Sequence, residues 1–329
     1  RLYEVELATP GDVATDRVGF RTIESRGGDI LLNGERVFLR GISIHEEAPD
    51  GGRAWSEAHA RTLLGWARAL NCNYVRLAHY PHNEHMLRVA DELGLMVWAE
   101  IPVYWVMDYT SARTMRLAEM HLREMIDRDR NRASVIIWSV GNETGDDPDR
   151  TAFRVALGQR VKAWDPSRLL SAACFARMER GAGGRIETIH VEDPFGDVAD
   201  VLAINQYVGW YHDEPESLHG VNVELRWDKP FLISEFGAGV KQGLRGEPDE
   251  RWTEEYGVRL YRQTLDWLGT VEELDGLSPW ILKDFRSPRR PLYGIQDWWN
   301  RKGLISGNGV KKDVFDVLRA RYQEWARDR

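Results

Sequence analysis

Cysteine is scarce in this sequence, which has only Cys72 and Cys174 among its 329 residues. Each lies in or beside an apolar segment, so we expect two buried free thiols, with neither a disulfide framework nor a set of metal ligands. Long apolar runs are also missing, since none approaches the roughly 20 residues that a membrane span needs. These absences exclude a disulfide-stapled scaffold and a membrane-spanning protein.

Positive charge is not in excess either. The formal net charge is −8 and the isoelectric point is near 5.7, whereas a nucleic-acid partner would require a basic domain or stripe. No secretory leader is visible and the chain begins with Arg1, so we expect a processed or truncated piece. The compartment, cytoplasmic or secreted, and association into a homo-oligomer stay open. A hydrophobic fraction of 43% and a charged fraction of 29% indicate an ordinary soluble globular protein.

Short apolar segments alternate with amphipathic ones from residue 37 onward. Strands are expected near residues 37–43, 73–78, 95–101, 135–140, 169–174, 201–206, 230–235 and 278–283. Helices are expected near residues 56–70, 83–93, 113–129, 150–164, 250–268 and 312–326, with weaker helices and long loops after the fifth and sixth strands. This alternation predicts an α/β fold, a (β/α)8 TIM barrel. An open doubly wound sheet is the alternative, although no Gly-x-Gly-x-x-Gly follows any strand.

Residues 1–36 have a different pattern, typical of β-structure. Tyr3, Val5 and Leu7 alternate with polar neighbours, and Asn33-Gly34 between two apolar runs predicts a hairpin. We interpret residues 1–36 as a short β extension, the remnant of a preceding β-domain, in front of a catalytic barrel at residues 37–329.

Two glutamates each end an apolar strand. Glu143 follows the run at residues 135–140, where Gly141 is expected to let the backbone turn sharply, and Glu235 ends the run at residues 230–234. Either could be a solvated loop residue. On the fourth and seventh strands of a barrel, however, both would face the mouth where active sites lie. One protonated and one ionised carboxyl group are the basic equipment for cleaving a glycosidic bond.

The segments around these glutamates carry a specific resemblance. Residues 138–143 and 234–237 resemble the acid/base and nucleophile motifs of the family 2 glycoside hydrolases, which include β-galactosidases, β-mannosidases and β-glucuronidases. Residues 39–46, 73–81 and 91–100 resemble the first three barrel strands of that family, and the resemblance extends over about residues 18–329. It implies a retaining mechanism with Glu143 as acid/base, Glu235 as nucleophile and Asn142 at the 2-hydroxyl of the sugar. No metal or organic cofactor is implied.

Four histidines, His45, His79, His82 and His85, are candidate zinc ligands. His79, His82 and His85 are spaced so that they drift around a helix whose start Pro81 breaks, whereas zinc needs a compact set of ligands. We expect His45, just past the first strand, to hydrogen-bond the substrate, and His79 to pack in the wall of the mouth.

Aromatic residues at the strand ends suit a carbohydrate, since an aromatic face with a polar tip matches the mixed surface of a sugar. Asn205, Tyr207 and Tyr211 follow the sixth strand, and Trp280 belongs to the eighth. The resemblance places Tyr207 beside the nucleophile and makes Trp280 a sugar platform.

The stretch Asn300-Arg301-Lys302 bears on the choice of sugar, because it resembles the Asn-x-Lys motif with which β-glucuronidases grip the carboxylate of their substrate. A buried carboxylate requires a cation and further donors. Lys302 would supply the charge, Asn300 an amide donor and Tyr211 a hydroxyl. The alternative is a solvated basic loop of ordinary composition.

The favoured interpretation is an exo-acting hydrolase of terminal β-D-glucuronides. A β-galactosidase or β-mannosidase on the same machinery, or an inactive carbohydrate-binding fragment, are the alternatives. The sequence departs from the family pattern at residues 281–283, and unusual loops at residues 46–55 and 286–299 are expected to shape the rim.

Overall fold

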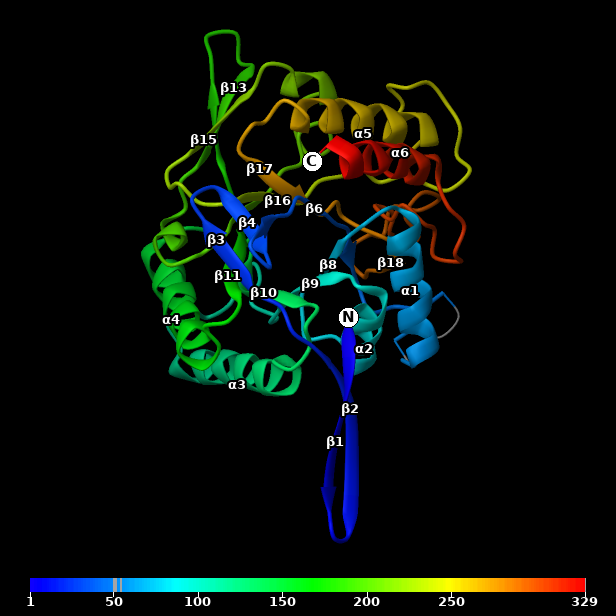
Figure 1. Ribbon diagram of the computed structural model, residues 1–329. Coiled ribbons are helices and arrows are strands. Elements are labelled where there is room, and N and C mark those ends of the chain that lie inside the picture. Colours follow the sequence, from blue (N-terminus) through cyan, green and yellow to red (C-terminus); the bar gives the residue numbers. More distant parts are fainter. Residues whose placement is uncertain (50–51, 54, 329) are drawn as a thin grey trace.

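The computed structural model describes residues 1–49, 52–53 and 55–328, and parallel strands form a closed barrel at its centre (Figure 1). The first barrel strand consists of two halves, β6 (Leu39–Arg40) and β7 (Ser43–Ile44). The remaining strands are β8 (Tyr74–Leu77), β9 (Met96–Glu100), β10 (Val135–Asn142), β11 (Leu169–Cys174), β14 (Leu202–Asn205), β16 (Phe231–Glu235) and β17 (Leu274–Leu277). They pair in this order, and β6 pairs with β17 while β7 pairs with β8, so the sheet closes on itself. The prediction of a (β/α)8 barrel is confirmed.

The barrel strands are buried on both faces, which explains their continuous apolar runs. Every residue of β10 is buried, for example, and so is every residue of β16. The polar residues that occur within these apolar runs are buried as well, so each of them needs a hydrogen-bond or ionic partner inside the protein.

Helices surround the barrel on the outside (Figure 1). They are α1 (Glu57–Ala69), α2 (Glu84–Leu93), α3 (Ala112–Asp129), α4 (Pro148–Trp164), α5 (Glu254–Leu268) and α6 (Asp313–Asp328). Five of them begin at a side chain that accepts a hydrogen bond from a free backbone N–H of the first turn, which stabilises the helix start. These capping residues are Ser56, Asn83, Ser111, Asp147 and Thr253. No helix in the described part of the chain is long and apolar enough to cross a membrane.

The segment after the fifth barrel strand deviates from the regular alternation. Residues 175–230 are all described and contain no α-helix. They form two short 3-10 helices, η1 (Pro194–Asp197) and η2 (Pro215–Leu218), and a small sheet of β12 (Arg177–Arg180), β13 (Ile186–Val191) and β15 (Asn222–Leu225). The weaker helices expected here are present only as these two 3-10 helices, and the expected long loops are partly ordered as strands. The 6-residue β13 follows a Gly-rich turn, which is a strand signal that the sequence contained.

The eighth strand was placed at residues 278–283, and this boundary is wrong. β17 ends at Leu277, and the following residues form an irregular segment that still bonds its neighbours, with the N–H of Ser278 donating to Ile233 O at 2.9 Å. There the backbone N–H of Ile281 donates to Lys302 O at 3.1 Å, and that of Leu282 donates to Ser43 O at 2.9 Å. A buried segment is apolar whether or not it forms a strand. The apolar run at these residues therefore does not distinguish a strand from an irregular buried segment. Trp280 consequently lies beyond the strand.

A small sheet covers the opposite, N-terminal end of the barrel. It comprises β3 (Ile23–Arg26), β4 (Asp29–Leu32) and β5 (Glu35–Arg36), and Ile23 and Ile30 pack into one apolar cluster with Tyr74, Trp98 and Leu232 of the barrel interior. The hairpin predicted at Asn33-Gly34 is present, and both residues have the positive φ angles, 54° and 84°, that such a turn requires.

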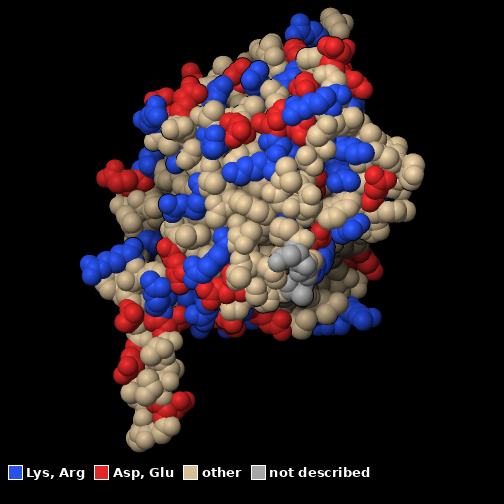
Figure 2. All heavy atoms as spheres, turned by 90° about the vertical axis from the view of Figure 1, so that its right-hand side faces the viewer, with Lys and Arg blue, Asp and Glu red and all other residues tan. Residues whose placement is uncertain are grey.

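The first 19 residues form a hairpin of β1 (Leu2–Thr9) and β2 (Asp12–Gly19) that stands away from the body of the molecule (Figures 1 and 2). The apolar residues Val5, Leu7 and Val13 are exposed on it. Our interpretation of residues 1–36 as the remnant of a preceding β-domain stays a prediction. The catalytic part, predicted at residues 37–329, carries one further pair of short strands, β18 (Phe285–Arg286) and β19 (Trp299–Asn300), beside its C-terminal mouth.

Candidate active site

A cavity of about 350 Å³ opens at the C-terminal ends of the barrel strands. Nine of the ten predicted site residues line it, namely His45, Asn142, Glu143, Tyr207, Tyr211, Glu235, Trp280, Asn300 and Lys302. The tenth, Asn205, lies directly behind them, where its amide donates to Glu143 Oε1 at 2.9 Å. Residues up to 257 positions apart in the chain, His45 and Lys302, thus meet because the barrel brings the C-terminal ends of its strands to one face.

Glu235 ends β16 and is buried. Its Oε1 accepts a hydrogen bond from Arg76 Nη1 at 2.8 Å, and its Oε2 accepts one from Tyr207 Oη at 2.7 Å. Burial raises the pKa of Glu235 above its ordinary value, and Arg76 counteracts this rise by stabilising the ionised form. Gly237 allows the chain to continue past the carboxylate, since a Cβ there would lie 2.6 Å from Trp280 O.

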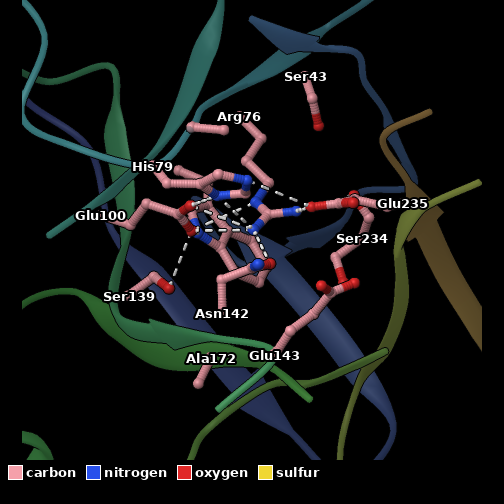
Figure 3. Close-up of polar contacts among 12 residues, drawn as sticks. Ser43, Arg76, His79, Glu100, Ser139, Asn142, Glu143, Ala172, Ser234 and Glu235 are labelled. Carbon is pink, nitrogen blue, oxygen red and sulfur yellow. Dashed lines mark hydrogen bonds and ion pairs between the residues drawn. The ribbon is translucent and has the colours of Figure 1, made fainter. Parts of the chain in front are cut away.

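Glu143 follows β10 and is half-buried. Trp105 Nε1 donates to its Oε2 at 2.9 Å, opposite the amide of Asn205 on Oε1. The expected turn at Gly141 is displaced, because β10 continues through Asn142 and Glu143 itself adopts the left-handed conformation with φ of 50°. This turn directs the carboxylate into the cavity, and Figure 3 shows Glu143 and Glu235 pointing toward each other.

Arg76 and Glu100 form a buried ion pair beneath the two glutamates, and the prediction of the site missed both. The Arg76 guanidinium is fully buried and reaches Glu100 at 3.1 Å and Asn142 Oδ1 at 2.8 Å, in addition to Glu235 (Figure 3). Burial raises the pKa of Glu100, but Arg76 and His79 outweigh this effect and hold it at about 2. A signal was available, because a charged residue inside an apolar strand must find a buried partner.

Two asparagines connect this ion pair to Glu143. Asn142 Oδ1 accepts hydrogen bonds from Arg76 and, at 3.1 Å, from Asn205 Nδ2. Asn205 Oδ1 in turn accepts one from Ser234 Oγ at 2.8 Å. With its carbonyl oxygen engaged from behind, Asn142 presents its amide group to the cavity that it lines.

The histidines point to separate partners. His45 Nδ1 donates to Ala78 O at 2.9 Å and His82 Nε2 donates to the same oxygen at 3.1 Å, while His79 Nδ1 contacts Glu100 Oε1 at 2.5 Å. Burial holds the pKa of His45 well below its ordinary value, so its Nε2 faces the cavity as an acceptor. His85 lies in the first turn of α2. Among the described residues, no three His, Cys, Asp or Glu side chains are arranged to hold a metal ion.

Aromatic rings build the walls of the cavity. The Trp280 ring stacks on His79 with centroids 4.8 Å apart, so His79 packs in the wall as expected and also contacts Glu100. Trp105, which the prediction missed, is 41% exposed at the mouth and adopts a positive φ of 57°. A non-glycine residue held in this conformation beside an active site is a frequent functional signal, but it is a property of the backbone and leaves no trace in the sequence.

Lys302 lies in the wall of the cavity that Tyr207 and Tyr211 form. The residue is 4% exposed, and its ammonium group donates to Tyr211 Oη at 2.7 Å and lies over the rings of Tyr207, Trp210 and Tyr211. It forms no ion pair with any described carboxylate. Burial lowers the pKa of Lys302 to about 7, and nearby Arg290 acts in the same direction.

Asn300 ends β19, two residues before Lys302, and is buried. Its Oδ1 accepts a hydrogen bond from the Lys302 backbone N–H at 3.1 Å, which orients the side-chain amide. The arrangement therefore gathers an ammonium group, an amide and a phenol at one wall. This wall can neutralise and hydrogen-bond one carboxylate.

The two loops expected to shape the rim do line the cavity where they are described. Residues 286–290 contribute throughout, and the loop at residues 46–55 contributes Arg53. Residues 50, 51 and 54 of that second loop lie outside the described residues.

The comparisons with known proteins agree with this geometry. Residues 23–273 match the model of the glycosyl hydrolases family 2, TIM barrel domain. A β-glucuronidase of Streptococcus agalactiae is 28% identical over 94% of this chain and 54% of its own length. A β-galacturonidase of Eisenbergiella tayi, solved with bound galacturonate, is 28% identical with a TM-score of 0.83 over 95% of this chain and 56% of its own.

A β-glucuronidase of Faecalibacterium prausnitzii is 26% identical, with a TM-score of 0.84 over 98% of this chain and 55% of its own. This chain spans about half the length of the curated relatives that it matches. The family model covers most of the barrel and includes the strands that carry both glutamates. The chain therefore belongs to the family 2 glycosyl hydrolases, of which it contains the TIM barrel domain.

Proposed function

We propose that this chain is the catalytic barrel of an exo-acting glycoside hydrolase that removes terminal β-D-glucuronides with retention of configuration. The observation that carries the proposal is the buried Lys302, which lines the same cavity as Glu143 and Glu235 and forms no ion pair among the described residues. A buried cation is costly unless an anion compensates it. The carboxylate of a uronic acid would supply that charge at the required place.

In the first chemical step, Glu235 attacks the anomeric carbon and forms a covalent glycosyl ester, while Glu143 donates its proton to the departing oxygen. Arg76 and Tyr207 support the ionised form of Glu235, because both donate hydrogen bonds to it at 2.8 Å and 2.7 Å. In the second step, Glu143 accepts a proton from water, and the water oxygen displaces Glu235 from the anomeric carbon. The sugar is released with its original configuration.

The sugar ring is held by groups around these carboxylates. The amide of Asn142 faces the cavity and would bond the 2-hydroxyl, whose contact strengthens in the transition state. His45 presents an acceptor nitrogen, and Trp280 forms a wall against which the ring can pack. Lys302, Asn300 and Tyr211 would bind the C6 carboxylate.

A second candidate is the hydrolysis of β-D-galacturonides, because the similar Eisenbergiella tayi protein is a β-galacturonidase solved with galacturonate. Galacturonate and glucuronate differ only in the orientation of the 4-hydroxyl and share the carboxylate. The Lys302 wall therefore suits both sugars. Discrimination between them would depend on side chains that meet the 4-hydroxyl.

The test is a panel of chromogenic aryl β-glycosides carrying glucuronate, galacturonate, galactose or mannose. We expect the highest kcat/KM on the glucuronide, and at least about a hundredfold lower value on galactose, which lacks a charge for Lys302. Equal rates on charged and neutral sugars would refute the uronide assignment. A folded protein with no turnover on any of the four would favour the inactive fragment.

Retention is tested separately by following the anomer of the first product with NMR. The β-anomer is expected before mutarotation sets in, because two displacements restore the configuration. Initial release of the α-anomer would contradict the nucleophilic role of Glu235 while leaving the choice of sugar intact.

A further inference from the structure

The rim of the cavity carries three arginines that the proposed reaction does not use. Arg286 ends β18, Arg289 and Arg290 lie on the loop that follows it, and all three line the cavity. Among the described residues, none of them forms an ion pair with a carboxylate. Most of the other arginines in the described part of the chain do form one, for example Arg177 with Glu192 and Arg259 with Glu216. The net charge of the protein is −8, so these three arginines are not part of a generally basic surface.

The loop that carries these arginines is fixed by backbone hydrogen bonds. The N–H of Ser287 donates to Trp298 O at 2.8 Å, and the N–H of Trp298 donates to Arg290 O at 2.9 Å. Arg286 is paired with Trp299 in the two-stranded sheet of β18 and β19. The guanidinium groups are therefore presented from an ordered support at the mouth.

Two of these arginines face different parts of the cavity. Arg290 Nη2 donates to Tyr211 Oη at 3.1 Å, the oxygen that also accepts from Lys302, so Arg290 lies toward the wall proposed for the sugar carboxylate. Arg289 lies over the ring of Trp105, with Cζ 4.7 Å from the centroid. Because Trp105 donates to Glu143, the group that would protonate the departing oxygen, Arg289 lies on the leaving-group side.

Trp105 is itself held firmly in this position. Its backbone N–H donates to Asn142 O at 3.3 Å, and its carbonyl oxygen accepts from Tyr109 Oη at 2.6 Å. Tyr104 and Trp105 are 37% and 41% exposed, so two aromatic surfaces and one guanidinium border the exit from Glu143. Aromatic surfaces suit a second sugar ring, and a guanidinium binds carboxylate or sulfate through paired hydrogen bonds.

We propose that the leaving-group side of the cavity binds an anionic sugar, so that the preferred substrates are acidic oligosaccharides in which the terminal β-uronoside is joined to a residue carrying a carboxylate or a sulfate. Arg289 is the principal contact, and Tyr104 and Trp105 support the sugar ring. The inference rests on the proposed function, since the role of Glu143 defines which side receives the leaving group.

The test compares disaccharides that share a terminal β-glucuronoside and differ only in the second sugar, which is neutral, carboxylated or sulfated. Wild-type protein, Arg289→Gln and Arg177→Gln are assayed for kcat/KM on each. Arg177 is a matched control, because it is exposed and ion-paired on β12, away from the cavity. Sulfur-linked versions of the disaccharides give dissociation constants without turnover.

We expect wild-type protein to prefer the acidic second sugars by about ten- to a hundredfold, mainly in KM, which corresponds to one charged hydrogen-bonded contact. Arg289→Gln should reduce this preference at least about tenfold, whereas Arg177→Gln should keep it. Comparison of the carboxylated and sulfated forms then shows which anion is bound better.

Equal kcat/KM and equal affinity for acidic and neutral second sugars would overturn this inference. So would an acidic preference that survives in Arg289→Gln. If wild-type protein hydrolyses aryl glucuronide but shows no acidic preference, only the inference fails. If it cleaves no uronide at all, the proposed function fails first.

Discussion

The two sides of the cavity differ in how their charges are compensated. On the side of Glu235, Arg76 meets Glu100 and Glu235 directly, and the amide of Asn142 joins the same network. On the other side, Lys302 and Arg290 both donate to the single neutral oxygen of Tyr211 and form no ion pair among the described residues. On the first side each of these charges has a partner of opposite sign, whereas on the second the positive charges have none among the described residues.

The difference separates the roles of the two sides. A network in which every charge has a partner would hold Glu235, the proposed nucleophile, in one orientation before substrate arrives, which is the preorganisation that catalysis requires. A buried cation without a counter-charge reduces stability, and its presence is understandable where a ligand supplies the anion. We therefore interpret the first side as the site of reaction and the second as the site of specificity.

The largest expected effect comes from Glu235→Gln, which keeps the shape of the side chain but removes the nucleophile. We expect kcat on aryl glucuronide to fall about 10⁴-fold or more, as for other residues that form covalent intermediates. Steady-state kinetics measures the loss, with Glu224→Gln as a control because Glu224 is exposed on β15. Comparable losses in both variants would count against a special role for Glu235.

Arg76→Met should destabilise the folded protein, because it removes the cation that pairs with Glu100 and Glu235. It leaves Glu100 and Glu235 buried without their cation, so we expect the free energy of unfolding to fall by about 3–5 kcal/mol. Urea denaturation measures the change. Arg17→Met removes an exposed ion pair with Glu92 and should cost less than about 1 kcal/mol. Similar small losses in both variants would show that the buried network contributes little to stability.

Lys302→Met preserves the length of the side chain and removes its charge. We expect kcat/KM on the glucuronide to fall about a hundredfold, because the carboxylate would enter an uncompensated pocket. The residual rate on the matching galactoside should change less than about threefold, since a neutral sugar loses no ionic contact. Equal losses on both sugars would refute the role of Lys302 in uronate recognition.

The pH dependence of kcat/KM on uronides should follow the lowered pKa of Lys302, which is about 7. Above this value the free protein loses the ammonium charge, so kcat/KM on uronides should fall by up to about tenfold per pH unit, with no such decline on neutral glycosides. On the acid side, the raised pKa of Glu235 should place the loss of activity above the ordinary value of 4.5. Alkaline profiles that coincide for both sugar types would contradict this assignment.

The smallest expected effect is a gain in stability. Lys302→Met should raise the free energy of unfolding by about 1 kcal/mol at pH 6, because it removes a buried charge. The lysine pKa is lower in the folded state than its ordinary 10.5, so wild-type protein gains stability as the pH rises from about 7 toward 10.5. The advantage of the variant should therefore shrink in denaturant titrations at alkaline pH. A loss of stability at pH 6 would contradict the interpretation.

The barrel and the glutamates could be predicted because they leave local patterns. Apolar runs that alternate with amphipathic segments indicate a parallel sheet closed by helices, and a carboxylate at the end of such a run marks the mouth. The position of the eighth strand could not be predicted, because residues 279–282 form a buried apolar run although they lie beyond β17, which ends at Leu277. Trp105 was missed because its place in the site depends on a backbone turn.

Arg76 and Glu100 illustrate most clearly what could not be predicted from the sequence. Each was visible as a charge within an apolar strand, yet their mutual partnership depends on the adjacency of β8 and β9 and on the reach of Arg76 across the barrel to Glu235. Asn205 and Asn142 likewise meet only because strands β10 and β14 converge at one end.

The order of residues along the chain determined the alternation of strand and helix, the two carboxylates at strand ends and the lysine that follows the last strand, because these depend on neighbours close in sequence. Only the tertiary structure decided which charges find partners and which do not. That outcome depends on distances between segments hundreds of residues apart, which the closure of the barrel sets.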